Sequence, residues 1–158
     1  MRHTCLIVAL LAILAAPTRL PGQERSLYWS DLTVNARLDA DGRLHVKERH
    51  AMVFTGDWNG GERKFRLVVG QDFEFERVSR IDRNSGNAIA LVKGDLSRVD
   101  QFKWIDSNTL RWRSRLPEND LFNKTEIIYE IEYILSYILW LQDGHYLLDH
   151  NFGIPGRP

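Results

Sequence analysis

The stretch LTVNARLDADGRLHVKERHAMVF, residues 32–54, decides the fold of this chain. Apolar residues occupy every second position from 32 to 38, and this alternation is typical of a strand with one buried face. Asp39–Gly42 has the composition of a tight turn, and apolar positions resume beyond it. The stretch therefore predicts a β-hairpin. Its apolar positions are Leu32, Val34, Ala36 and Leu38 before the turn, and Leu44, Val46, Val53 and Phe54 after it.

The rest of the chain shows the same succession of short strand-like segments separated by turns. Clusters of Gly, Asn, Asp, Pro and Ser separate short segments that are rich in β-branched and aromatic residues. About seven or eight short strands at this spacing predict an all-β fold, an antiparallel β-sandwich that is immunoglobulin-like in broad architecture. Residues 134–141 could instead form a short buried helix. The other expected strands are 73–82, 88–92, 102–105, 109–116 and 125–135, with turns at 56–61, 84–87, 106–108, 117–120 and 142–144.

The first 22 residues have the layout of a secretory signal peptide. Arg2 gives a positive start, an apolar run extends from Cys5 to Ala16, and Pro17–Gly22 ends the run. The run of 12 residues is too short to span a bilayer, which needs roughly 20. We expect cleavage after Gly22, with Ala16 as the alternative site. Residues 23–158 would then form one exported domain.

Removal of the leader also changes the composition. It takes away Arg2 and Arg19, so the mature chain has two more acidic than basic residues. A chain with this balance and no basic face is not expected to bind nucleic acid. The only cysteine, Cys5, leaves as well, which excludes a disulfide, a thiol nucleophile and a cysteine metal site. The stability of the domain must therefore come from burial of apolar and aromatic side chains.

The segment Thr125–Leu141 is the most apolar part of the mature chain. Three glutamates interrupt it, and a charge at membrane depth costs several kcal/mol, so we interpret the segment as a strand rather than a transmembrane helix. One face carries apolar and tyrosine side chains, and the other carries Glu130 and Glu132. If this strand paired with 109–116, Arg111 and Arg113 would lie opposite these glutamates on a solvated face of the sheet.

Paired carboxylates offer an alternative interpretation as a carbohydrate-active hydrolase. Retaining glycosidases hold two carboxyl groups about 5–5.5 Å apart, a separation that residues two apart on a strand can approach. Glu130 with Glu132 and Glu74 with Glu76 fit this spacing. Aromatic platforms for a sugar would come from Trp58, Trp104, Trp112 and Trp140.

Histidines provide the only candidate metal ligands. His145 and His150, with Asp149 between them, are a candidate metal set, but zinc requires three or four ligands that converge. His45 and His50 are an odd number of residues apart, so they should point to opposite faces of a strand. We therefore predict no metal and no cofactor.

One segment resembles a known family. From Asp41 the chain gives a hairpin strand that carries Glu48, then a Gly-rich turn, and then Gly60, Arg63 and Phe65 in the order Gly-x-x-Arg-x-apolar. This order, directly behind a signal peptide, resembles the bacterial predicted membrane proteins known as domain of unknown function 2207. Thr125–Tyr133 is similar to a later strand of that family. The likeness covers about residues 27–150, but the chain lacks the proline that usually follows the arginine step.

The resemblance implies a location and an architecture rather than a reaction. It predicts an extracytoplasmic domain on the periplasmic or extracellular face of a bacterial membrane, with membrane association through segments beyond residue 158. The chain ends at Pro158 without such segments, so we expect it to be the N-terminal part of a longer protein. The expected function is that of a binding or interaction module whose partner is an unidentified protein or cell-envelope ligand.

The candidate binding residues are Trp58, Gly60, Arg63 and Glu48. Binding residues on β scaffolds gather in loops, and positive φ angles at Gly60 and Gly61 would let Arg63 turn back toward the first hairpin. We predict that Arg63 and Glu48 form a partly buried pair, with Trp58 covering the core beneath. This pair, or one between Arg63 and Glu62, gives Arg63 a structural role. The alternative is that Arg63 and Trp58 belong to a recognition loop.

Overall fold

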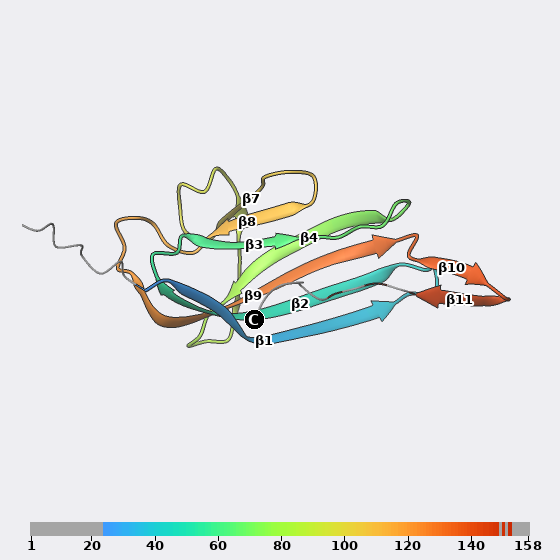
Figure 1. Cartoon of the computed structure of the whole chain (residues 1–158), viewed down its shortest axis with the longest axis horizontal. Coiled ribbons are helices and arrows are strands. Elements are labelled where there is room, and N and C mark those ends of the chain that lie inside the picture. Colours follow the sequence, from blue (N-terminus) through green and yellow to red (C-terminus); the bar gives the residue numbers. More distant parts are fainter. Residues whose placement is uncertain (1–23, 149, 151, 153–158) are drawn as a thin grey trace, which may run out of the picture.

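The computed structural model describes residues 24–148, 150 and 152. The predicted signal peptide at 1–22 and Asp149 therefore lie outside the described residues. These residues form strands, turns and loops but no helix, which confirms the predicted all-β class (Figure 1). The strands are β1 (Ser26–Leu38), β2 (Leu44–Gly56), β3 (Gly60–Lys64), β4 (Asp72–Ile81), β5 (Ala88–Ala90), β6 (Val92–Lys93), β7 (Gln101–Trp104), β8 (Thr109–Arg113), β9 (Phe122–Ser136), β10 (Leu139–Gln142) and β11 (His145–Leu148).

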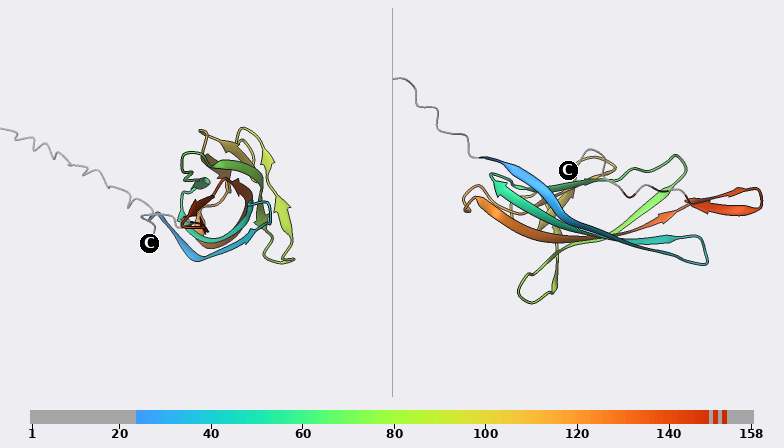
Figure 2. Two further views of the ribbon diagram at one scale, coloured as in Figure 1. Left: turned by 90° about the vertical axis from the view of Figure 1, so that its right-hand side faces the viewer. Right: turned by 60° about the horizontal axis from the view of Figure 1, so that its bottom comes forward.

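Two sheets make up the body of the molecule. Sheet A has the strand order β1-β2-β9-β4-β5, and sheet B has the order β3-β8-β7-β6. All neighbours are antiparallel except the short pair β6 and β7. Figure 2 shows the two sheets curling around a common interior, which is the arrangement expected of a β-sandwich. The hairpin of β10 and β11 extends from one end as a separate two-stranded sheet.

The predicted hairpin is confirmed as β1 and β2, paired from Leu38 opposite Leu44 onward. Its turn is closed by the Asp39 N–H, which donates to the Arg43 carbonyl at 2.8 Å, and Gly42 has the positive φ of 83° that the turn requires. A β-bulge interrupts the pairing between Trp29 and Asp31. Local turn chemistry and alternation were therefore sufficient to predict this element.

β9 lies at the centre of sheet A, between β2 and β4. Its apolar face is confirmed, since Tyr129, Ile131 and Tyr133 are buried. The alternative helix at 134–141 is wrong, because β9 continues to Ser136 and the chain then turns at Tyr137, with φ of 56°, into β10.

The predicted pairing of the 109–116 strand with 125–135 is wrong, because β8 belongs to sheet B and β9 to sheet A. Arg111 and Arg113 therefore do not face Glu130 and Glu132. The two glutamates pair with basic side chains on their own sheet, and the two arginines bind groups on sheet B or in the loop before β7. Arg111 binds Glu62 on β3, Arg113 donates to the Leu96 carbonyl, Glu130 binds Lys47 and Arg49, and Glu132 binds Arg77.

The core between the sheets is rich in aromatic rings. Phe65, which follows β3, lies with its ring centroid 5.2 Å from Tyr133 and 4.5 Å from Phe73. These contacts join sheet B to sheet A and agree with the expectation of a core built from aromatic burial. Within the described part of the chain, no helix is long and apolar enough to cross a membrane.

Candidate functional site

A cleft of about 670 Å³ opens where residues of β1 and β2 in sheet A approach β3 and β8 in sheet B. The loop between β2 and β3 forms one wall, and the loop before β7 contributes to another. Its apolar lining consists of Leu27, Trp29, Met52, Trp58, Leu96 and Trp112.

Trp58 is held in the wall of this cleft from two sides. Its indole N–H donates to the Ser26 carbonyl at 2.9 Å, and the Arg25 guanidinium lies 3.9 Å from the ring centroid. The ring also packs against the core, as predicted. Trp58 thus covers the core and presents part of its surface to the cleft.

Gly60 and Gly61 do not have the positive φ angles that were expected from the sequence. That conformation occurs at Gly56, with φ of 84°. A Cβ atom on Gly60 would lie 1.8 Å from the Trp112 carbonyl oxygen, and one on Gly61 would lie 2.5 Å from the Trp112 ring. The two glycines therefore allow the backbone of β3 to approach Trp112, and they leave the cleft without side chains at this point.

Charged side chains surround the aromatic lining. Four are basic and two are acidic, which leaves an excess of two positive charges around the cleft. Arg111 donates to Glu62 at 2.7 Å through its Nε, and the Nε of Arg113 donates to the Leu96 carbonyl at 2.9 Å. The six charged residues are Arg25, Lys103, Arg111, Arg113, Glu62 and Asp95.

The predicted pair of Arg63 and Glu48 is confirmed, and its burial exceeds the prediction. Arg63 Nε lies 2.8 Å from Glu48 Oε2, and Nη2 lies 2.6 Å from Oε1, so the contact is bidentate. Arg63 is 5% exposed and Glu48 is 1% exposed. Since Arg63 is on β3 and Glu48 on β2, the ion pair connects the two sheets through the interior. Arg63 thus lies in a buried strand position rather than in a recognition loop.

Two further residues complete the environment of Glu48. His50 Nε2 lies 2.8 Å from Oε2, and the Tyr133 hydroxyl donates to Oε1 at 2.7 Å. Each carboxylate oxygen therefore accepts two hydrogen bonds. The Trp29 indole N–H donates to His50 Nδ1 at 3.1 Å, which assigns the ring hydrogen to Nε2. Because Trp29 also lines the cleft, this chain of hydrogen bonds links the cleft wall to the buried pair.

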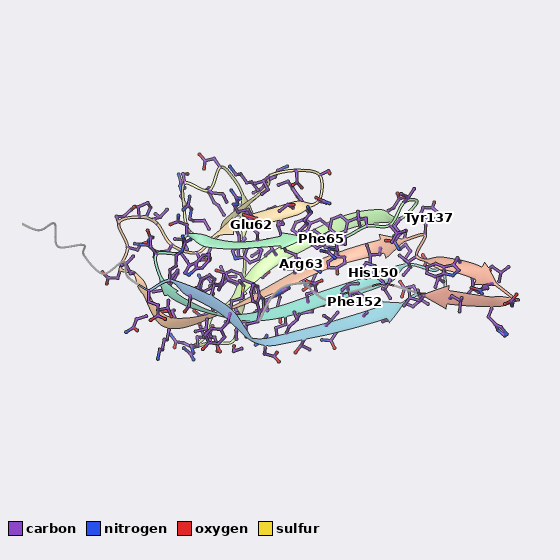
Figure 3. All side chains as sticks on the ribbon, viewed as in Figure 1. Glu62, Arg63, Phe65, Tyr137, His150 and Phe152 are labelled. Atoms are coloured by element: carbon purple, nitrogen blue, oxygen red, sulfur yellow. The ribbon has the colours of Figure 1, made fainter. Side chains whose placement is uncertain are left out.

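Sequence reasoning missed His50, Tyr133 and Trp29. A signal was present for His50, because it follows Glu48 by two residues and so shares its face of the strand. No local signal marks Tyr133, which reaches Glu48 only through the pairing of β2 with β9. Figure 3 shows Arg63 on β3 and Phe65 directly after this strand, and His150 lines the same small cavity as these two residues and Tyr133.

The network controls the ionisation of its members. Burial favours a neutral Glu48, but the hydrogen bonds of Arg63 and His50, the charge of Arg63 and the Tyr133 hydroxyl outweigh it and lower the pKa of Glu48 to about 2. Burial disfavours the charged form of Arg63 too, yet Glu48 raises its pKa overall. Burial and the Glu48 charge raise the pKa of the Tyr133 hydroxyl well above its usual range. The pair is therefore ionised at neutral pH.

The remaining candidates occupy other places. His45 lies 2.7 Å from Asp39, on the face of β2 opposite to His50, as expected. His150 packs edge-to-face against Phe152, with ring centroids 4.7 Å apart. Among the residues that the structure describes, no three His, Cys, Asp or Glu side chains come close enough to hold a metal ion.

The paired glutamates are tied to cations or exposed. Burial raises the pKa of Glu130, but hydrogen bonds from Lys47 and Arg49 lower it overall. Glu74 and Glu76 are exposed on β4.

A scan against protein-family models gives no match, and searches of the curated proteins and of the solved structures give none either. The assignment of function therefore rests on the geometry of the cleft and of the network beneath it.

Proposed function

We propose that the protein is the extracytoplasmic binding module of a membrane-associated bacterial protein, and that its cleft takes an anionic ligand. The observation that carries this proposal is the lining of the cleft, in which the partly exposed Trp29 and Trp58, beside the buried Trp112, are surrounded by four basic and two acidic residues. Two further features belong to the same proposal. Immunoglobulin-like architecture has the number and spacing of the strands as its support, and membrane association beyond residue 158 has the family resemblance.

The dimensions and chemistry of the cleft suit binding. Ligand sites commonly enclose about 300–1,000 Å³ and combine apolar walls with a few polar groups. Tryptophan supplies a large rigid contact area at a low entropic cost, and an arginine or lysine can bind a carboxylate or phosphate. Arg113 donates to the Leu96 carbonyl, and Lys103 acts on the Asp95 carboxylate of the same cleft through its charge.

The wall of the cleft is pre-organised. Trp29 is held by His50, which is held by Glu48, and Glu48 is fixed by Arg63 from the opposite sheet. A site that is already in its binding geometry loses less entropy on association. The buried residues predicted for the site would then act by positioning Trp29 and not by touching the ligand.

The hydrolase alternative has no specific observation in its favour. A glycosidase general acid needs a raised pKa, whereas the pKa of Glu130 is lowered by Lys47 and Arg49. Glu132 is paired with Arg77 on the same outer face of sheet A.

Export is tested by the N-terminus of the protein. If residues 1–22 are a cleaved leader, N-terminal sequencing of secreted material should begin at Gln23, and the mature protein should contain no thiol because Cys5 has been removed. Secreted material that begins with Met1 would contradict the leader.

The cleft is tested by titration of the intrinsic tryptophan fluorescence. We expect hexaglutamate or a galacturonic acid trimer to give a saturable change, because both are anionic, and hexalysine to give none. The probe that binds distinguishes an acidic peptide from an acidic glycan. Lys103→Glu should weaken binding about tenfold, the effect of losing a strong interfacial contact, while Lys124→Glu, outside the cleft, should not. Absence of saturable binding by both anions, or equal binding of hexalysine, would overturn the proposal.

A further inference from the structure

The outer edge of β1 is unusual in its length and exposure. β1 has 13 residues and is the terminal strand of sheet A, so that no other strand among the described residues pairs with its outer edge. Figure 2 shows β1 at the margin of the molecule. Edge strands present unpaired N–H and C=O groups, and proteins usually protect them with proline, lysine or a bulge. Residues 31–38 contain neither proline nor lysine, and the bulge lies before Asp31.

The backbone groups on this edge can be assigned from the hairpin turn. The Asp39 N–H donates to the Arg43 carbonyl, so this pair is hydrogen-bonded across the hairpin. Hydrogen-bonded and non-hydrogen-bonded pairs alternate along an antiparallel ladder. Residues 33, 35 and 37 therefore direct their N–H and C=O groups toward β2, whereas residues 32, 34, 36 and 38 direct theirs outward.

The side chains of the same segment separate into two faces. Val34 packs against the core, and by alternation Leu32, Ala36 and Leu38 share its face. Leu32 is 38% exposed and Leu38 is 46% exposed, because no strand of the described residues covers the outer side of β1. The opposite face is polar and carries Asp31, Thr33, Asn35 and Arg37.

We propose that a second copy of this chain pairs with β1 in an antiparallel, two-fold symmetric ladder centred on Val34. In this register Asp31 lies opposite Arg37 of the second copy, and Thr33 lies opposite Asn35 of the second copy. On the apolar face, Leu32 lies opposite Ala36 of the second copy. The two copies of sheet A then form one continuous sheet, and residues 32, 34 and 36 satisfy their outward backbone groups.

Charge complementarity selects both the partner and the register. Because the dimer is two-fold symmetric, the pair of Asp31 with Arg37 of the other copy occurs twice. Both pairs are at non-hydrogen-bonded positions, where opposing side chains are closest. Shifting the centre to Thr33 or Asn35 places neither charge opposite its complement. Within one copy Arg37 contacts Asp39 through Nη1 alone, and a guanidinium has further N–H donors for a second carboxylate. An isologous contact of this kind closes at the dimer.

The proposal is tested first by the oligomeric state of the purified protein in analytical ultracentrifugation. We expect a concentration-dependent dimer. Ala36→Pro removes an N–H that points away from β2, so it should raise the dimer dissociation constant about tenfold or more while the monomer keeps its fold by circular dichroism. A monomer at all concentrations up to the millimolar range, or a dimer unaffected by Ala36→Pro, would overturn the proposal.

Charge reversal tests the register. Asp31→Arg alone and Arg37→Asp alone each place like charges opposite each other twice, and each should raise the dissociation constant about tenfold. The double variant Asp31→Arg with Arg37→Asp restores both complementary pairs and should recover the affinity of the original protein. Failure of the double variant to recover would exclude the Val34-centred register.

Discussion

Replacing Arg63 with alanine is expected to lower the free energy of unfolding by about 3–5 kcal/mol, the largest effect of any single substitution predicted for this protein. The substitution leaves the Glu48 carboxylate, 1% exposed, without its positive partner and with two of its four hydrogen bonds broken. It also removes the only ion pair found across the interior between β2 and β3 in the described residues. Urea denaturation at neutral pH measures the change.

Two variants make this result interpretable. Arg63→Lys keeps the charge but loses the planar bidentate contact, so it should be less destabilising than alanine. Arg111→Ala is the matched control. Arg111 is an exposed arginine on β8, the strand that pairs with β3, and it binds Glu62 at the surface. Exposed pairs contribute about 0–1 kcal/mol, so this control should change stability little. An Arg63→Ala protein within about 1 kcal/mol of the original would show that the pair is not important for stability.

Acidification is expected to lower the free energy of unfolding, because it protonates the same Glu48 carboxylate. The pKa of Glu48 is about 2 in the folded protein and 4.5 in an unperturbed carboxyl group. A lowered pKa in the folded state stabilises the protein fully above pH 4.5, and that stabilisation is lost as the pH falls from 4.5 through 2. The difference corresponds to about 3 kcal/mol. The groups that face Glu48 are Arg63, His50 and Tyr133.

Urea denaturation between pH 6 and pH 2, together with an NMR titration of the Glu48 carboxyl carbon, measures this effect. Tyr133→Phe removes one hydrogen bond from the carboxylate, so it should raise the pKa of Glu48 and move the acid-dependent loss of stability to higher pH. Tyr129→Phe is the matched control, because Tyr129 is equally buried but its hydroxyl pairs with Ser114. A Glu48 pKa near 4.5 in the folded protein, or equal shifts in both tyrosine variants, would contradict the assignment.

The buried network also explains how a small domain without a disulfide among its described residues can hold an open cleft. Trp29 would be free to fill the cleft if its indole were not tied to His50. The contact between Glu48 and Arg63 thus helps to position Trp29 in the cleft wall, because Glu48 binds His50 and His50 binds Trp29. We therefore expect variants of Arg63 to alter both stability and ligand affinity, although Arg63 does not line the cleft.

The sequence by itself determined the local elements. Alternation and turn chemistry predicted the hairpin at 32–54 and the buried face of β9, because both depend on residues close together in the chain. The order of Glu48, the Gly-rich turn and Arg63 also led to the correct ion pair. In this case β2 and β3 are consecutive strands joined by a short loop, so few arrangements of the two charges are possible.

Only the tertiary structure decided the strand order and everything that depends on it. Arg111 and Glu130 have complementary charges and suitable spacing, yet they lie on different sheets because the pairing of β9 with β2 and β4 is set by the burial of the whole apolar face. The same pairing brings Tyr133 to Glu48, 85 residues away in the chain. The requirement for glycine at positions 60 and 61 is also set by a distant residue, because Trp112 leaves no room for a Cβ atom at either position. Alternation specifies which face of a strand is buried, but it does not specify which strand lies beside it, and the cleft exists only once that choice has been made.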